Sequence, residues 1–448
     1  MFDRCAMRSY QLVAVLALAG PVPACASDLS SILKEALAND PVYASARFSQ
    51  QASAESQPQA RAALLPNVSL SAGVSTAHYR LESENQTLAP SFEQTFTSWG
   101  PSLQLSLPLY RSQLWESLSQ SRLTVQQSEA RFAQARQDLI VRVAQAYFDV
   151  LASNDALAAI RTNKQAISEQ LAQAQREFEV GTKTIVDTHE ARARYDQAVA
   201  QEQVALGDLI VKKSTLQAII GHEAGELTPL ADAPLLVPPQ PADIEAWARS
   251  AEQGNLSVLA ARAAAEIARH ETQRARDAYR PTLDLTGQVQ WQRSTATSLY
   301  PFSNTVTQGG IGITATVPLY TGDLLQSRIR EAHARQFQAE QDLEAARRTA
   351  SQSARQAYTG TDYGLAQVHA LESAEVSAKS QLDSTRLGYE VGVRINLDVL
   401  NANTQLFNTQ RDLKKARYDF LVNGLRLKAA SGNLEDRDVQ AVSGLLLR

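Results

Sequence analysis

The chain carries the same pattern twice, about 211 residues apart, and this duplication limits its fold more than any other feature. Phe178-Glu179-Val180-Gly181 returns as Tyr389-Glu390-Val391-Gly392, and Leu107-Pro108-Leu109-Tyr110 returns as Val317-Pro318-Leu319-Tyr320. An internal repeat decides the architecture, because each copy forms the same supersecondary unit. Each copy has the order helix, strand, strand, very long helix, turn and helix.

The two copies span residues 27–221 and 243–432, with a proline-rich linker at 222–242 and a short tail at 433–448. The predicted elements are first helices at 28–65 and about 243–280, hairpins at 67–109 and 282–319, long helices at 112–178 and 323–389, and second helices at 183–221 and 394–432. The predicted fold class is therefore mainly α with β, internally duplicated.

Residues 1–26 have the pattern of a secretory signal peptide. Arg4 and Arg8 give it a positive start, an apolar stretch follows, and Ala24-Cys25-Ala26 forms a small-residue cleavage site. The mature chain is then expected to begin at Ser27. Lipoprotein processing at Cys25 stays open as an alternative.

Both cysteines, Cys5 and Cys25, fall inside this segment, so the mature chain has no thiol for a disulfide or a Cys-bound metal. The formal net charge of the whole chain is −4, and the mature part carries −5 because the segment removes two basic residues and one acidic residue. This balance argues against a nucleic-acid partner, which requires a concentrated basic surface.

Two segments in each copy alternate with the period of a β-strand. The apolar positions are Val68, Leu70, Ala72 and Val74 with Leu103, Leu105 and Leu107 in the first copy, and Leu283, Leu285, Val289 and Trp291 with Ile311, Ile313 and Ala315 in the second. Strands of about 10 residues with one apolar face suit an outer-membrane barrel with lipid outside and water inside. A soluble hairpin pair is the alternative.

Aromatic side chains near the strand ends favour the barrel, because they predict two girdles at the membrane surfaces. They include Tyr79, Phe92, Phe96, Trp99 and Trp291 at one end and Tyr110 and Tyr320 at the other. Four strands cannot close a barrel, and open edges are not tolerated in lipid, so several chains must pool their strands. Two chains would give a filled barrel of eight strands, whereas three would give twelve strands and an open lumen.

The long helices have an extreme length. Residues 112–178 contain no proline or glycine, and residues 323–389 contain no proline and only Gly360, Gly364 and Gly388, so each helix would extend for ~100 Å. The positions that step by seven along the first are Leu118, Val125, Phe132, Leu139, Ala146, Ser153, Ile160, Ile167 and Ala174, all apolar except Ser153. A second stripe runs through Val143, Val150, Leu157, Leu171 and Phe178 and breaks at Lys164. This is coiled-coil packing. Two shorter helices stacked end to end would match one long helix, which predicts antiparallel pairs.

The chain resembles the TolC-type outer membrane efflux protein family over essentially its whole mature length. The resemblance is densest in two segments, Gly388–Ala402 and Ala416–Asn423, which resemble the second-repeat tip and its return helix, while Gly181–Asp196 resembles the first-repeat tip. Membership implies a homotrimer in the outer membrane of a Gram-negative bacterium, with one twelve-stranded β-barrel continuing into a periplasmic α-barrel. It also implies a periplasmic adaptor and an inner-membrane transporter of the RND, ABC or MFS type.

The resemblance also assigns the tip residues. Asp398 and Asn401 match the pore constriction, although the best-known members carry Asp at the second position, and Asp187, Tyr389 and Arg394 match the gating contacts. The adaptor-docking turns correspond to Val180, Gly181, Thr182, Val391, Gly392 and Val393. The simpler alternative for Asp187 and Asp398 is a first-turn carboxylate that complements the helix dipole.

Catalytic and metal-binding functions find little support. The six histidines are scattered, with no pair at metal-binding spacing, so we expect no metal, no cofactor and no enzyme activity. A periplasmic coiled-coil adaptor or a structural protein is the alternative function, but amphipathic strands between helices oppose both. The sequence predicts a passive exit duct, gated at its periplasmic tip, for efflux or type I secretion, and it does not specify the cargo.

Overall fold

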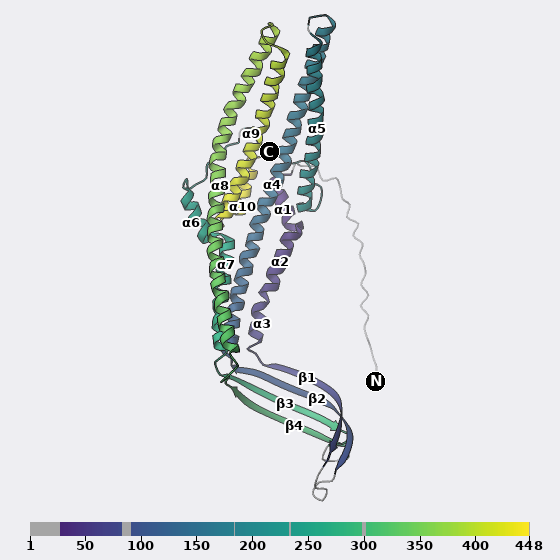
Figure 1. Cartoon of the computed structure of the whole chain (residues 1–448), viewed down its shortest axis with the longest axis vertical. Coiled ribbons are helices and arrows are strands. Elements are labelled where there is room, and N and C mark those ends of the chain that lie inside the picture. Colours follow the sequence, from purple (N-terminus) through teal and green to yellow (C-terminus); the bar gives the residue numbers. More distant parts are fainter. Residues whose placement is uncertain (1–26, 83–90, 183, 233, 298–301, 448) are drawn as a thin grey trace.

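The computed structural model is an elongated molecule with a four-stranded sheet at one end and two helical hairpin tips at the other (Figure 1). It describes residues 27–82, 91–182, 184–232, 234–297 and 302–447, so the predicted signal peptide with Cys5 and Cys25 lies outside the described residues. The first repeat contains α1 (Leu29–Asn39), α2 (Pro41–Ala54), α3 (Ser56–Ala62), β1 (Asn67–Leu81), β2 (Phe92–Tyr110), α4 (Ser112–Glu179) and α5 (Ile185–Ile220). The second contains α6 (Ile244–Gly254), α7 (Leu256–Asp277), β3 (Thr282–Ser294), β4 (Asn304–Thr316), α8 (Leu324–Glu390) and α9 (Asn396–Ala430), followed by α10 (Asp436–Ser443).

The strands form one antiparallel sheet in the order β1-β2-β3-β4, so the hairpins of the two repeats lie side by side. The register places Leu70 opposite Leu103, and Leu103 opposite Val289, in one apolar row. Hydroxyl pairs line the other face, where Ser71 and Ser102 are 2.8 Å apart. The predicted alternation is therefore confirmed. The apolar face is open, and its most exposed members are Val68, Leu70, Val74, Ile311 and Ile313.

The aromatic residues divide between the two faces of the sheet. Trp99 and Trp291 occupy positions of the apolar face, and the guanidinium of Arg293 lies 5.9 Å from the Trp99 ring centre. Tyr79 occupies a position of the serine face and packs against Phe92, with ring centres 5.7 Å apart. Of the two predicted girdles, the one at this end of the sheet therefore includes Trp99 and Trp291 but not Tyr79 and Phe92, because alternation along a strand sends neighbouring positions to opposite faces.

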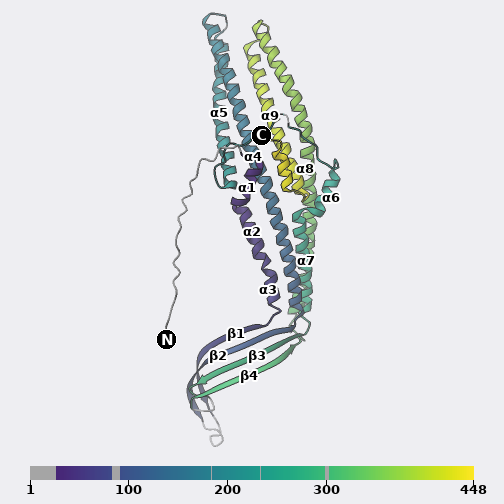
Figure 2. The same ribbon diagram turned by 180° about the vertical axis from the view of Figure 1, so that it is seen from behind.

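Shorter helices cover α4 and α8 along their length. Figure 2 shows α1, α2 and α3 beside the sheet-proximal half of α4, and α5 beside its tip-proximal half. In the same way α6 and α7, then α9, cover α8. The predicted heptad seam is confirmed in the middle of α4, where Leu139, Val143, Ala146 and Val150 are buried. Among the described residues, no helix contains a stretch long and apolar enough to cross a membrane.

Lys164, which interrupts the second apolar stripe of α4, pairs with the carboxylate of Glu202 on α5. Its ammonium group donates to Glu202 Oε2, and Arg161 Nε donates to Glu202 Oε1 at 3.0 Å. Glu202 is buried, and the hydrogen bonds from Lys164 and Arg161 hold the pKa of its carboxyl below the ordinary value. The polar interruption therefore fits the coiled coil, because a buried charge is tolerated when it is paired.

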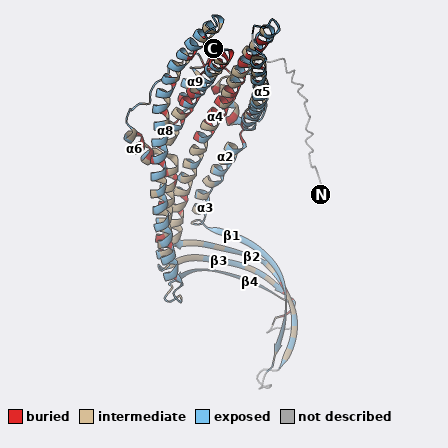
Figure 3. Ribbon diagram, turned by 45° about the horizontal axis from the view of Figure 1, so that its top comes forward, coloured by how far each residue is buried: buried red, intermediate tan, exposed pale blue. Residues whose placement is uncertain are grey.

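The main hydrophobic core lies at mid-height, where α1, α4, α5, α9 and α10 meet (Figure 3). Tyr147 and Phe148 of α4 are fully buried there, with their rings edge to face at 5.5 Å. The Tyr147 hydroxyl donates to the Thr228 carbonyl at 2.8 Å, and burial raises the pKa of this tyrosine. This core joins the two repeats at mid-height, between the sheet and the tips.

Residues 27, 226–231 and 445–447, here called the collar, meet beside this core. Ser27 forms a parallel bridge with Leu227, and Leu230 forms an antiparallel bridge with Leu446. The Ser27 amide donates to the Glu226 carbonyl at 2.8 Å. The linker and the tail, predicted only as connections, therefore hold the start, the middle and the end of the chain together.

The first helix of each repeat is interrupted, so the prediction of single helices at 28–65 and 243–280 was wrong. In the first repeat Asp40 caps α2 and Pro41 begins it, because proline lacks the N–H that a continuing helix requires. At this joint Asn39 Nδ2 donates to the last-turn carbonyl of Ile220 at 2.9 Å. In the second repeat Asn255 alone provides both the helix cap and the interhelical hydrogen bond. It caps α7 through Oδ1, and its Nδ2 donates to the Ala430 carbonyl at 2.8 Å.

Asn255→Ala should therefore lower the free energy of unfolding more than Asn39→Ala does. We expect a loss of about 1–2 kcal/mol for Asn255→Ala, because it removes a helix cap and an interhelical hydrogen bond, and about 1 kcal/mol for Asn39→Ala. Denaturant unfolding of the purified protein, followed by helical circular dichroism, measures both. Asn154→Ala on the exposed surface of α4 is the control, with a change within about 0.5 kcal/mol. Equal losses of unfolding free energy in Asn154→Ala and Asn255→Ala would contradict the stabilising role of Asn255 at this joint.

Candidate functional site at the helical tips

Both helical hairpins turn at a glycine in the left-handed region. Gly181 has φ 77° and Gly392 has φ 78°, a conformation that glycine adopts without strain. Thr182 N donates to the Glu177 carbonyl at 2.9 Å, and Val393 N donates to the Gly388 carbonyl at 2.8 Å. These are the bonds of a Schellman motif, which ends a helix in a fixed geometry. The recurring Glu-Val-Gly sequence therefore produces two tips of the same shape.

The turns present apolar side chains to solvent. Val180 is 74% exposed, and Val391 and Val393 are 66% and 78% exposed. Val186, in the first turn of α5, is 66% exposed as well. Exposed valines gathered at the extreme end of a molecule are typical of a contact surface.

The carboxylates after the two turns have different roles. Asp187 forms a capping box with Thr184, since its Oδ2 accepts from the Thr184 hydroxyl at 2.8 Å and from the Thr184 amide at 3.2 Å. Asp398 occupies the equivalent position after Ile395, which has no capping side chain. Asp398 instead lies 3.7 Å from the guanidinium of Arg394. The loss of one hydroxyl in the second repeat thus leaves its carboxylate available for an ion pair.

Two polar contacts join the tip ends of the second hairpin and the first. The Tyr389 hydroxyl of α8 donates to Glu177 Oε2 of α4 at 2.8 Å. Arg194 of α5 donates to Asn401 Oδ1 of α9 at 3.3 Å. Burial raises the pKa of Tyr389, and the hydrogen bond and negative charge of Glu177, together with the charge of Asp187, add to this effect. Tyr389 therefore stays protonated at neutral pH and acts as a donor.

A buried layer supports the tips from below. Asn403 Nδ2 of α9 donates to Asn163 Oδ1 of α4 at 3.0 Å, and both side chains are buried. Leu400 of α9 packs with Ile167 and Ala198 in a small apolar cluster. A paired buried amide fixes the register of neighbouring helices, because a shift would leave both amides without partners.

The structure brings some of the predicted residues together and adds two others. Arg394 lies beside Asp398, and Asp187 lies near enough to Tyr389 to affect its pKa. Glu177 and Arg194 were not predicted. The repeat itself held a signal for them, because the positions 211 residues further on are Gly388 and Gln405, so the charges occur in one copy only.

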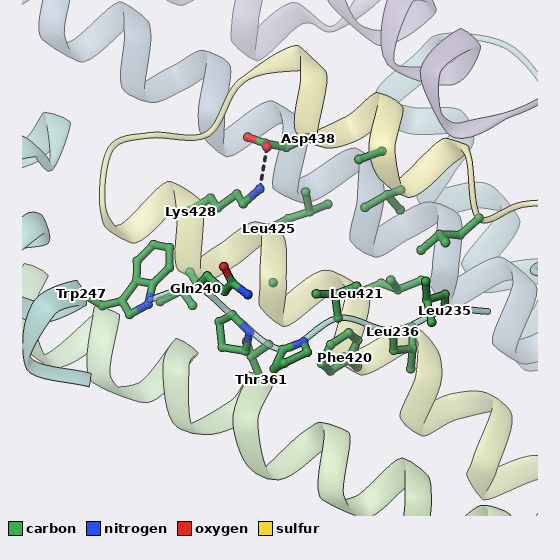
Figure 4. Close-up of a pocket in the computed structure, with 18 residues that line it drawn as sticks. Leu235, Leu236, Gln240, Trp247, Thr361, Phe420, Leu421, Leu425, Lys428 and Asp438 are labelled. Carbon is green, nitrogen blue, oxygen red and sulfur yellow. Dashed lines mark hydrogen bonds and ion pairs between the residues drawn. The ribbon is translucent and has the colours of Figure 1, made fainter. Parts of the chain in front are cut away.

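A separate cavity of about 490 Å³ lies at mid-height, between the linker, α9 and α10 (Figure 4). Its walls are mostly apolar, with Trp247, Phe420 and Leu421 among them, and the ion pair of Lys428 with Asp438 at 2.6 Å crosses one side. Its position beside the collar separates it from the tips. Across the described ranges, no group of three or more His, Cys, Asp or Glu side chains gathers as metal ligands do.

Comparison with known proteins places these features in a family. A family model described as "Outer membrane efflux protein" matches residues 32–222 and 247–433. The outer membrane protein TolC of Vibrio cholerae is 34% identical over 419 residues, covering 93% of each chain. The alkaline protease secretion protein AprF of Pseudomonas aeruginosa is 30% identical over 413 residues, covering 91% of this chain and 85% of that protein. The Campylobacter jejuni CmeC outer membrane channel shares the fold, with a TM-score of 0.76 at 16% identity and coverage of 99% and 98%.

The difference between the two caps can be tested by substitution. Thr184→Ala should destabilise the start of α5 by about 1 kcal/mol, whereas Ile395→Thr should stabilise the start of α9 by a similar amount. Hydrogen exchange of the amides at 185–188 and 396–399 measures each change. Thr385→Ala is the control, because that hydroxyl bonds within α8 and caps no helix. Unchanged exchange at the start of α5 in Thr184→Ala would contradict the capping role of this threonine.

Proposed function

The chain belongs to the outer membrane efflux protein family, and from this premise we propose that three copies form one duct whose entrance is built by the helical tips. A TolC-like outer-membrane efflux channel is a transport protein and not an enzyme. The observation that carries the proposal is the open apolar face of the sheet, where Leu70 and Ile311 are each 75% exposed. A face of this kind requires an apolar environment, and lipid provides it.

Closure of the sheet requires other copies of the chain. β1 and β4 are the edges of the four-stranded sheet, and each leaves a row of backbone groups without partners. Lipid offers these groups no hydrogen bonds, so the β4 edge of one copy is expected to pair with the β1 edge of the next. Three copies give twelve strands, enough to leave a lumen lined by the serine and glutamine face.

The helices support the same arrangement. Apolar side chains are exposed on α5, at Val204 and Val211, and on α8, at Tyr363 and Val376. These two helices belong to different hairpins, so a ring of copies would bring the α8 surface of one against the α5 surface of another. Contact between them would bury the exposed side chains and close the helices into an α-barrel.

The partners follow from the tips. The exposed valines of both turns provide an apolar surface for a periplasmic adaptor, which in turn binds an inner-membrane transporter of the RND, ABC or MFS type. The likeness to AprF, a protein named for alkaline protease secretion, favours type I secretion as one route. Selection of the cargo then belongs to the transporter.

The tips also form the gate of the duct. Asp398 and Asn401 line the constriction, so each copy brings one carboxylate there, and Arg394 partly neutralises it. Tyr389 bonds to the first hairpin, and together with Arg394 and the nearby charge of Asp187 it biases the tips toward the closed state. Exposed contacts of this kind contribute only about 0–1 kcal/mol each, so repetition in three copies biases the closed state without locking it.

Loss of the gating contacts should open the channel. Tyr389→Phe removes a donor hydroxyl and Arg394→Ser removes a guanidinium, so each is expected to raise the single-channel conductance of the purified protein in planar bilayers. Tyr43→Phe is the control, because this tyrosine of α2 stacks on Phe132 far from the tips, and it should leave conductance unchanged. Material that is monomeric, fails to fractionate with the outer membrane and does not conduct would refute the duct itself.

The charge at the constriction should determine block by cations. Asn401→Asp adds a second carboxylate per copy, so Mg²⁺ should block the ion current at a several-fold lower concentration, because Coulomb terms add over all pairs. Asn154→Asp makes the same charge change on α4 away from the tip and serves as the control. Equal Mg²⁺ sensitivity of the two variants would remove Asn401 from the constriction.

A further inference from the structure

We propose that Glu177 is the acceptor that sets the closed position of the α8–α9 hairpin, and that Arg194 supplies a second tie through Asn401. This inference rests on the proposed gate and adds two residues to it. The two ties join different helix pairs, since Glu177 of α4 meets Tyr389 of α8, and Arg194 of α5 meets Asn401 of α9.

Contacts within the first hairpin fix the position of Glu177 independently of Tyr389. Its carbonyl accepts from both the amide and the hydroxyl of Thr182, each at 2.9 Å, so the turn fixes its backbone. Gln173 Nε2 donates to Glu177 Oε1 at 2.9 Å, which fixes the carboxylate and leaves Oε2 for the Tyr389 hydroxyl. An acceptor that is already oriented loses little freedom when the bond forms.

Asp187 is a weaker candidate for the same role. Its Oδ2 already accepts from the amide and the hydroxyl of Thr184, and these bonds satisfy the first turn of α5. Its charge reaches Tyr389, but a capping box would have to break for the carboxylate to turn away from Thr184. The helix cap and the tie to Tyr389 are therefore served by two different carboxylates.

Asn401 also contacts Arg194, so it has a second role in addition to lining the constriction. Asn401 accepts the guanidinium through Oδ1 at 3.3 Å, so the amide is drawn toward α5 of the first hairpin. The longer distance makes this the weaker of the two ties. The Arg194–Asn401 contact joins α5 to α9, whereas the Tyr389 contact joins α4 to α8. The Arg194–Asn401 contact therefore opposes rotation of the α8–α9 pair about the Tyr389 contact.

The test compares variants of the full-length protein in planar bilayers, after each variant is shown to run as the same oligomer as the wild type. Glu177→Ala should shift the balance between open and closed states by up to about fivefold per copy, as expected for loss of a part-exposed contact worth about 0–1 kcal/mol. Glu177→Gln keeps a neutral acceptor, so its conductance should lie between those of the wild type and Glu177→Ala. Glu179→Gln is the matched control, because Glu179 is exposed on the same last turn of α4.

The double variant Glu177→Ala with Tyr389→Phe separates a direct contact from two independent effects. We expect it to conduct no more than either single variant, because both substitutions break the same bond. Arg194→Ala should add to either one, since it breaks the second tie. Additive effects of Glu177→Ala and Tyr389→Phe would overturn the assignment of Glu177.

The conductance results distinguish refutation of this inference from refutation of the proposed gate. If Tyr389→Phe and Arg394→Ser raise conductance while Glu177→Ala does not, the gate stands and Glu177 is not its acceptor. An increase in Asp187→Asn without one in Glu177→Ala would give the role to Asp187 instead. If none of these variants changes conductance, the gate falls and this inference falls with it.

Discussion

Two helices of ~100 Å must be covered along their whole length, and the other elements of the chain are arranged to meet this requirement. In the described part of the chain no partner helix is as long, so each long helix is covered by shorter helices placed end to end. The free helix ends at each junction expose backbone groups that need partners. Asn39 and Asn255 supply them, and the collar fastens the chain around the same level. The mid-height core is thus the consequence of helix length.

The duplication gives two similar scaffolds, and function depends on the places where they differ. Both tips turn through the same Schellman geometry, so the hairpins start from one shape. Ile395 replaces the capping Thr184 of the first copy, which leaves Asp398 available to Arg394. Gly388 stands where the first copy has Glu177, so only one hairpin carries the acceptor. A symmetric pair of tips could not make these directed contacts between hairpins.

Periodicity in the sequence was enough to predict the strands, the long helices and the repeat, because each depends on local spacing. Apolar alternation placed Leu70 and Val289 on one face, and the heptad stripe found Val143 and Val150. The helix breaks have local signals in Asp40-Pro41 and in the capping residue Asn255, which the prediction of single helices did not use. The collar and the contact of Glu177 with Tyr389 were missed because they join segments far apart in sequence. The split of the aromatic residues follows from strand alternation, whereas the predicted girdles placed these rings only by their distance along the strand.

The contacts between the two hairpins change in kind from mid-height to the tips. We expect this change to determine which part of the molecule can move. At mid-height the helices meet through buried apolar side chains such as Tyr147 and Phe148, whose separation would expose a large area to water. Toward the tips the contacts between hairpins diminish to a paired amide, Asn163 with Asn403, a small apolar cluster around Leu400, and then two polar ties. Water can replace the partners of polar groups at small cost, whereas it cannot replace apolar packing. For the proposed gate, opening is therefore expected at the tips, with the mid-height core as the fixed base of the second hairpin.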